Sequence, residues 1–263
     1  SGYYAVRING ETRGGEKYGN DWVRHPVAIK KGRNEFLFQG ERGRLRARLF
    51  DPPAAVFFTD KDMTLPDLIV GDPSPVWIGL RLVNATAETI EGVRISYGPE
   101  AAKKESRVEM TVPPMMARKL AIPLDLGAAE AEGPVKLTLR ASARAGRKAV
   151  EAPAFDLELK AVSGRAHQAR TFRSGIDGSV QYFGVAPWTG EALDKDMSKP
   201  ALFLSLHGAG VEAIGQARAY KPKSWGYVVA ATNRRPYGFD WEDWGRLDAI
   251  EVLEEAARLF GTD

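Results

Sequence analysis

The sequence predicts a multidomain protein in which two small all-β, sandwich-like domains precede an α/β unit. The first half contains many short runs of alternating apolar and polar residues, separated by turns rich in Gly, Pro and Asn. After about residue 165, continuous apolar strands alternate with helical patterns, which is typical of a parallel sheet. A chain of 263 residues is long enough for two or three such domains. The predicted boundaries are 1–74, 75–163 and 164–263.

The first region, 1–74, begins with short strands and tight turns. Val6 and Ile8 alternate with polar residues and lead into Asn9-Gly10, a strong hairpin signal. Apolar and arginine residues alternate over 44–49, which predicts a further strand with one cationic face. The stretch 51–74 is rich in Pro and Asp and is interpreted as a linker or an irregular connection.

The second region, 75–163, has the even strand spacing of a small sandwich. In "VWIGLRLVN" the apolar residues Ile78, Leu80 and Leu82 alternate, which predicts one buried face. The triplet Asn84-Ala85-Thr86 fits a glycosylation sequon, but triplets of this kind arise by chance. We interpret it as a turn at the end of a strand.

The third region alternates strands and helices. Apolar strands are predicted at 202–206 and 227–231, with a short helix over 212–220 between them. A longer helix is predicted in the stretch 241–260, and its expected apolar face comprises Leu247, Ile250, Leu253, Ala257 and Phe260. Gly261 follows the helix at the position of a C-cap.

Composition excludes several chemistries. The chain has no cysteine, which excludes disulfides, thiolate catalysis and zinc sites with Cys ligands. Its net charge is only +3, with both signs interspersed, so nucleic acid is not an expected partner. No apolar run approaches the roughly 20 residues of a membrane span. No Gly-x-Gly-x-x-Gly follows a predicted parallel strand, and we expect no dinucleotide or other cofactor.

The most informative stretch is "LFLSLHGAG", residues 202–210. A buried strand here leads directly into His207-Gly208-Ala209-Gly210. A tetrahedral acyl intermediate carries negative charge on oxygen, which preorganised backbone N–H groups can stabilise. Glycines allow the main chain to turn sharply and approach a substrate closely. Open α/β sheets also place their ligands at the carboxyl ends of their strands, where this loop is expected.

Together with "WGYVVAATNRRPYGFDWEDWGRLDAIEVLEEA", this loop makes residues 165–263 resemble a known family. The stretch resembles the amino-terminal part of an α/β-hydrolase domain of the bacterial esterase and prolyl-oligopeptidase-like group. The resemblance implies that the amide of Ala209 donates to the oxyanion while Gly210 shapes the loop. It also implies that His207 and Gly208 support the turn structurally, and that His207 is not the triad base.

The chain departs from that family at the nucleophile. No Gly-x-Ser-x-Gly occurs, and none of the three histidines follows a candidate nucleophile elbow. We therefore expect the serine and its triad partners to lie beyond these residues, and this chain alone to be inactive. The resemblance implies a secreted or periplasmic protein acting on an ester, a peptide or an acetylated carbohydrate. Oligomeric state stays open.

Side chains beyond the second parallel strand are candidates for the substrate pocket. Asn233, Arg234, Arg235 and Tyr237 should lie at the same sheet edge as the oxyanion loop. Asp177-Gly178 precedes Ser179 in "SGIDGS" and predicts a hairpin turn, so Ser179 lacks the strand–turn–helix context of a nucleophile.

An acidic cluster and two tryptophans surround the start of the long helix. The cluster is explained by capping of the helix N-terminus, with a metal site as the less favoured interpretation. The two tryptophans, three residues apart, favour packing over sugar binding. These residues are Asp240, Trp241, Glu242, Asp243, Trp244 and Asp248.

The two β regions support an alternative function. The first loosely resembles half of a galactose-binding-type jelly roll, and the second an immunoglobulin-like module. The alternative is a non-catalytic carbohydrate-binding or adhesion protein, with Tyr3, Tyr18 and Trp22 as a possible sugar platform, although core packing explains these aromatic residues as well.

Overall fold

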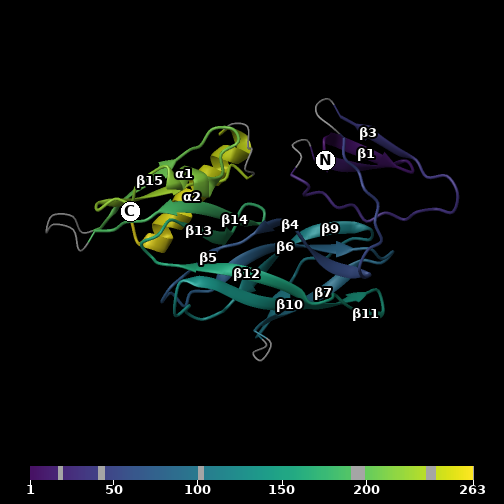
Figure 1. Ribbon diagram of the computed structural model, residues 1–263, viewed down its shortest axis with the longest axis horizontal. Helices are drawn as coiled ribbons and strands as arrows, with labels where there is room; N and C mark the ends of the chain where they lie inside the picture. The colour runs from purple at the N-terminus through teal and green to yellow at the C-terminus, as the bar shows by residue number, and fades with distance from the viewer. Residues whose placement is uncertain (17–19, 41–44, 100–103, 191–198, 235–240, 263) are drawn as a thin grey trace.

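The computed structural model describes residues 1–16, 20–40, 45–99, 104–190, 199–234 and 241–262. The protein is mostly β, with several small sheets and two helices in these ranges. Figure 1 shows the central sandwich in the lower half of the molecule, with the amino-terminal sheet and the α/β part above it. In the described part, neither helix is long and apolar enough to cross a membrane.

The amino-terminal sheet has three strands in the order β2-β1-β3. β1 (Tyr3–Ile8) and β2 (Glu11–Glu16) form the hairpin predicted from Asn9-Gly10, and β3 (Phe36–Gln39) pairs antiparallel with β1. The strand expected over 44–49 is not formed, and Leu45 and Leu49 are exposed. Among the described residues 45–49, Arg46 exchanges hydrogen bonds with Ser1, and no ladder with a neighbouring strand is formed.

The sandwich packs two sheets face to face. One sheet has the order β4-β6-β9, formed by Val56–Thr64, Val76–Asn84 and Met116–Leu124. The other has the order β5-β12-β10-β7-β8, with β11 paired to β10. Its strands are Asp67–Ile69, Phe155–Val162, Gly133–Ala145, Ile90–Gly98, Lys104–Val108 and, for β11, Lys148–Glu151.

Alternation along each strand fills the space between the two sheets with apolar side chains. As predicted, Ile78, Leu80 and Leu82 of β6 are fully buried. The expectation of a linker over 51–74 is wrong, because β4 and β5 lie in this stretch and pair with β6 and β12. The alternating Val56 and Phe58 are masked in the sequence by the surrounding Pro and Asp residues, and the β4 ladder is interrupted between Thr59 and Thr64.

Asn84 closes the end of β6 from inside the protein. Its amide nitrogen donates to the carbonyls of Glu88, Val112 and Pro113, at 2.8–3.0 Å. Its side-chain oxygen accepts from the backbone and hydroxyl of Thr86. The side chain is fully buried, so the sequon is the strand-end turn that the sequence predicts.

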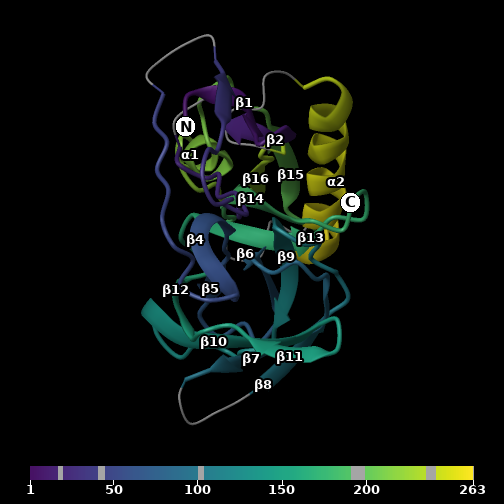
Figure 2. The ribbon, with the colours of Figure 1, turned by 90° about the vertical axis from the view of Figure 1, so that its right-hand side faces the viewer.

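The α/β part contains a four-stranded sheet in the order β13-β14-β16-β15. β13 (Gln168–Arg173) and β14 (Val180–Ala186) form the predicted hairpin, whereas β15 (Ala201–Ser205) and β16 (Gly226–Ala230) run parallel. The short helix α1 (Ala213–Arg218) packs on one face, where the carbonyl of Ala213 leaves no room for a Cβ at Gly184. The long helix α2 (Asp243–Phe260) covers the opposite face (Figure 2).

The buried face of α2 differs from the predicted one. The helix buries Gly245, Asp248, Ala249, Val252 and Ala256 against the sheet. Leu247, Ile250 and Leu253, which were expected in the core, are 37–43% exposed. Small side chains let the helix approach the strands closely, and a pattern built on large apolar residues therefore selects the wrong face. Gly261 does cap the helix in the left-handed conformation, with φ 62°.

The hairpin β13–β14 attaches the α/β part to the sandwich. The Thr171 hydroxyl donates to the carbonyl of Trp77 at 2.6 Å, and the Ala169 amide donates to a carboxylate oxygen of Asp67 at 2.8 Å. Arg170 also pairs with Asp72 at 3.2 Å. These contacts join residues about a hundred positions apart, so the hairpin belongs to both structural parts.

Candidate functional site

The carboxyl ends of the two parallel strands meet at one edge of the sheet. Ser205, the last residue of β15, lies opposite Ala230, the last residue of β16. The loop that begins at Leu206 and the turn at Asn233-Arg234 therefore leave the sheet side by side. This is the position predicted from the sequence for a ligand site in an open α/β sheet.

The glycine-rich loop after β15 is accessible. Gly208, Ala209 and Gly210 are all exposed, directly after the buried His207. Gly210 has φ 80°, a left-handed backbone conformation that favours glycine. The amides of Ala209 and Gly210 donate no hydrogen bond to another residue of the described part. Within the described ranges, these two amides are therefore available to an external acceptor.

The buried side chain of His207 contacts the loop from the interior of the protein. Its ring is 5% exposed, and Nδ1 lies 2.9 Å from the carbonyl oxygen of Gly208. Since a carbonyl only accepts, Nδ1 carries the proton and donates. The amide of Val211 donates to the same carbonyl at 3.3 Å.

The orientation of this carbonyl fixes the neighbouring amide. C=O and N–H of one planar trans peptide point in opposite directions. Because the Gly208 carbonyl points toward His207 and Val211, the Ala209 N–H of the same peptide points away from them. The role that the resemblance implies for His207, support of the turn, fits this geometry.

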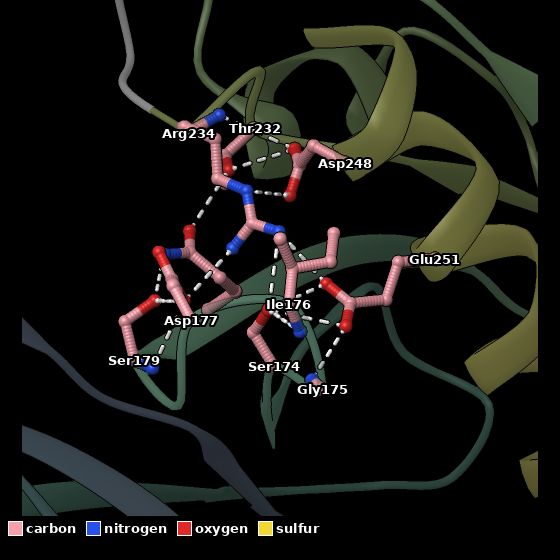
Figure 3. A network of polar contacts seen from close by, with 10 residues as sticks. Ser174, Gly175, Ile176, Asp177, Ser179, Thr232, Arg234, Asp248 and Glu251 are labelled. Carbon is pink, nitrogen blue, oxygen red and sulfur yellow. Dashed lines mark hydrogen bonds and ion pairs between the residues drawn. The ribbon is translucent and has the colours of Figure 1, made fainter. Parts of the chain in front are cut away.

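Arg234 lies at the centre of a polar network (Figure 3). Its guanidinium contacts Glu251 at 2.9 Å, Asp248 at 3.4 Å and Asp177 at 3.6 Å. It also donates to the Ser174 hydroxyl at 3.1 Å. The network connects the turn after β16 with α2 and with the turn between β13 and β14.

The same geometry directs Arg234 away from the oxyanion loop. β14 and β15 flank β16 on opposite sides, and the guanidinium reaches the turn that precedes β14. With three carboxylates around it, the side chain stabilises the fold at this edge. The structure does not test the predicted contact of Arg234 with substrate, which stays a prediction.

Asp248 secures the turn after β16. Asn233 and Arg234 both have positive φ, 57° and 60°, and the Arg234 amide donates to Asp248 Oδ2 at 3.2 Å. The Thr232 hydroxyl donates to the same oxygen at 3.3 Å. The Arg234 amide and the Thr232 hydroxyl thus converge on one anionic oxygen. Here that anion is a carboxylate of the protein itself.

The two aspartates of the network have opposite pKa shifts. Burial raises the pKa of Asp248, and the positive charge of Arg234 offsets only part of this rise. Burial also acts to raise the pKa of Asp177, but hydrogen bonds from Ser179 and the charge of Arg234 outweigh it and lower the pKa. The carboxyl that is completely buried is therefore the one that resists ionisation.

The position at the helix N-terminus explains only part of the acidic cluster at the start of α2. Glu242 occupies the N-cap position, but its side chain forms no capping hydrogen bond. Asp248 faces Arg234 inside the protein, so the capping interpretation is wrong for this residue, whereas Asp243 lies in the first turn as expected. Tyr237, Arg235 and Asp240 lie outside the described residues. In the described ranges, no group of three or more His, Asp or Glu side chains is arranged to hold a metal ion.

Each of the three histidines has one ring nitrogen on a backbone carbonyl in the described part. The rings of His25, His167 and His207 each pair with a backbone carbonyl, those of Gly14, Tyr220 and Gly208, respectively. The hydroxyl of Ser179 is 2.6 Å from Asp177 in the hairpin turn, as its sequence context indicated.

Two residues of this edge were not identified as site residues in the sequence. Glu251 accepts from Arg234, from the Ser174 hydroxyl and from the Gly175 amide. Trp241 donates its indole N–H to the carbonyl of His207 at 3.0 Å. In the sequence, Glu251 is one of many helix acids, and only the fold shows which of them faces the arginine.

Comparison with known proteins gives distant neighbours. No protein family model matches the chain, and no curated protein matches it. A thermostable esterase aligns over 80% of this chain and 68% of its own, with 13% identity and a TM-score of 0.24. An ASH (PapD-like) domain of human CEP192 aligns over 47% of this chain and 95% of its own, with 13% identity and a TM-score of 0.25. Similarity at this level carries no functional argument.

Proposed function

We propose that residues 164–263 are the amino-terminal part of a serine hydrolase domain that cleaves ester or peptide bonds by acyl transfer. In this proposal the loop Gly208–Gly210 supplies backbone donors to the oxyanion, and Ala209 is the principal donor. The nucleophilic serine and its triad partners are contributed by residues outside the 263 described by this sequence. The ester substrates include acetylated carbohydrates. The proposal also places the protein outside the cytoplasm, as an exported protein.

The observation that carries the proposal is the orientation of the Ala209 peptide. The Gly208 carbonyl is held from inside by the His207 ring and the Val211 amide, at 2.9 Å and 3.3 Å. The Ala209 N–H consequently faces outward, on an exposed loop at the carboxyl end of a parallel strand. A fixed, outward-directed amide at this position is what an oxyanion hole requires.

The first test is to sequence the gene downstream of the codon for Asp263. The proposal expects a Gly-x-Ser-x-Gly within about 20 codons, the length of one strand and turn. The complete gene product should then react with a fluorophosphonate probe and hydrolyse a p-nitrophenyl ester. A reading frame that ends without such a serine would exclude the hydrolase and leave the carbohydrate-binding alternative, which is then tested by calorimetric titration with polysaccharides.

The second test removes the proposed donor in that gene product. Ala209→Pro deletes the amide hydrogen and should lower kcat by about 10²–10³, the usual effect of losing one oxyanion donor. Ala209→Gly keeps the N–H and serves as the matched control. Equal activity of the two variants would exclude Ala209 as a donor.

The sugar platform predicted for the alternative, carbohydrate-binding function is only partly available. Tyr3 is 8% exposed and packs edge-on against Phe38, with ring centroids 5.2 Å apart. It therefore belongs to the core of the first sheet, and Tyr18 lies outside the described residues. Of the three aromatic residues, only Trp22 is described and partly accessible.

A further inference from the structure

Trp241 contacts the oxyanion loop from the segment that leads into α2. Its indole N–H donates to the carbonyl of His207 at 3.0 Å. Its ring also meets the imidazole of His207 edge-on, with centroids 5.1 Å apart and an interplanar angle of 74°. One side chain therefore contacts both the backbone and the ring of the residue on which the loop rests.

The backbone contact fixes a second peptide plane of the loop. The carbonyl of His207 points toward Trp241, so the N–H of Gly208 in the same planar peptide points away from it. The next carbonyl, that of Gly208, is fixed by His207 Nδ1. Two successive peptides, those that carry the Gly208 and Ala209 amides, are thus oriented by Trp241 and His207, respectively.

The ring contact restrains His207 itself. Nδ1 donates to Gly208, but Nε2 is buried and has no hydrogen-bond partner among the described residues. A single hydrogen bond leaves the imidazole free to tilt about that bond. The contact with the Trp241 ring is a second restraint on the imidazole, so the orientation of the Ala209 amide also depends on Trp241.

A neighbouring tryptophan provides a direct contrast. Trp244 is 55% exposed, and its ring lies 5.9 Å from the guanidinium carbon of Arg234. It has the same chemistry and is three residues further along the chain, but it is directed to the polar network. The indole N–H of Trp241 is hydrogen-bonded to the loop carbonyl, whereas the ring of Trp244 contacts Arg234.

We propose that Trp241 is a positioning residue of the oxyanion loop, acting through His207 to fix the Gly208 and Ala209 amides. The effect of Trp241 on catalysis rests on the proposed function, whereas its contact with the loop does not. The proposal assigns to the segment before α2 a role in setting the loop after β15.

The experiment measures backbone order of the loop by ¹⁵N relaxation in the 263-residue protein, with Trp241→Phe and the control Trp244→Phe. Phenylalanine keeps a ring at the site and removes the N–H. In the wild type and in Trp244→Phe, the order parameters of the Gly208 and Ala209 amides should be near 0.85, about the value of rigid backbone, and in Trp241→Phe they should fall below about 0.6. Unchanged order in a folded Trp241→Phe would overturn the proposal.

A second measurement needs no variant. The indole N–H of Trp241 should exchange with solvent about five-fold or more slowly than that of the exposed Trp244, as expected for one hydrogen bond. Equal exchange rates would overturn the proposal even if Trp241→Phe did not fold. A purely structural role would alter thermal stability and leave the order of these two amides unchanged.

The catalytic consequence is tested separately in the complete gene product. Trp241→Phe should lower kcat about ten-fold or more, because displaced donors lose orientation, while KM stays within about two-fold. If loop order falls but the gene product has no esterase activity, the proposed function fails and the positioning role stands. If esterase activity is present but neither loop order nor kcat changes, the positioning role fails alone.

Discussion

The sandwich and the α/β part are stabilised by different interiors. The sandwich buries a continuous apolar cluster between its sheets, in which Ile78, Leu80 and Leu139 are fully covered. The α/β part has a smaller apolar cluster around Phe183 and Val252. At its carboxyl edge it adds the mostly buried Arg234 with three carboxylates, of which that of Asp248 is fully buried.

The two interiors place different demands on side-chain geometry. Apolar burial is non-directional and tolerates many arrangements of similar volume. A buried ion cluster is stable only when every partner is present and correctly placed. Directional contacts are therefore concentrated where the fold has to hold a loop in one conformation.

The largest expected effect is loss of the central cation of the network. Arg234→Met leaves the completely buried Asp248 without its charge partner, which should cost about 3–5 kcal/mol of unfolding free energy. Urea denaturation measures this loss. The control is Arg258→Met, whose side chain is 71% exposed and whose pair with Glu255 should contribute less than about 1 kcal/mol. Similar effects of the two substitutions would show that the network is not a stabilising feature.

The deficit of Arg234→Met should depend on pH. Burial already raises the folded pKa of Asp248, and removal of the arginine raises it further. A carboxyl with a raised folded pKa contributes stability below its unfolded pKa, about 3.9, and loses it as pH rises through the folded pKa. The difference from wild type should therefore shrink on acidification from pH 7 toward pH 4. If the difference in unfolding free energy did not change with pH, the loss of stability would come from packing and not from the charge of Asp248.

An apolar truncation in the sandwich should have a comparable but pH-independent effect. Leu139→Ala removes a completely buried side chain from β10 and should cost about 2–5 kcal/mol, from lost burial and the remaining cavity. Because no titrating group is exposed or buried, the loss should be the same at pH 5 and pH 7. A clear pH dependence would mean that the two interiors are energetically coupled.

Two glycines of the oxyanion loop should differ when replaced by alanine. Gly210 has φ 80°, so Gly210→Ala should cost about 1–2 kcal/mol of local strain. A Cβ at Gly208 meets no atom within 4 Å and its φ is not left-handed, so Gly208→Ala should be nearly neutral. Thermal denaturation compares the two variants. The reverse order would contradict the loop conformation described above.

The smallest effect is expected where the two parts meet. Arg170→Met breaks the partly buried pair with Asp72, at 3.2 Å, and should cost about 0.5–1 kcal/mol. Hydrogen bonds and the Arg170 charge lower the pKa of Asp72 despite its burial, so this contribution should disappear as pH falls through the lowered pKa. Calorimetry should also show whether a single transition broadens as the contact weakens. An unchanged transition would mean that the backbone contacts of Thr171 and Ala169 suffice to hold the two parts together.

Much of the fold follows from short-range patterns. The Asn9-Gly10 and Asp177-Gly178 turns, the parallel strands β15 and β16 and the cap at Gly261 all have local signals, and the structure contains them. Patterns that depend on distant partners were interpreted wrongly. The described part of the alternating stretch, 45–49, pairs with no described strand, and α2 buries alanines where larger side chains were expected.

The sequence could predict where the candidate site lies, but not which side chains contact one another there. The position of Gly208–Gly210 at the end of an apolar strand is a local property and was predicted. The expected burial of that strand is wrong, because β15 is the outer strand of the described sheet and Phe203 is 48% exposed. The partners of Arg234 come from a hairpin turn and a helix, up to 60 residues away. No spacing rule connects them. The contact of Trp241 with His207 likewise spans 34 residues and depends on how α2 crosses the sheet.

The closed position of Asn84 has a consequence for how this chain can be produced. In a eukaryotic secretory pathway, a glycan would have to be attached before β6 and the Val112–Pro113 segment come together, because all three amide contacts of Asn84 are to buried or partly buried carbonyls. A chain carrying a sugar there could not place this side chain in the interior. Glycan occupancy and correct folding should therefore exclude each other, and the fraction glycosylated would report how slowly this end of the sandwich closes.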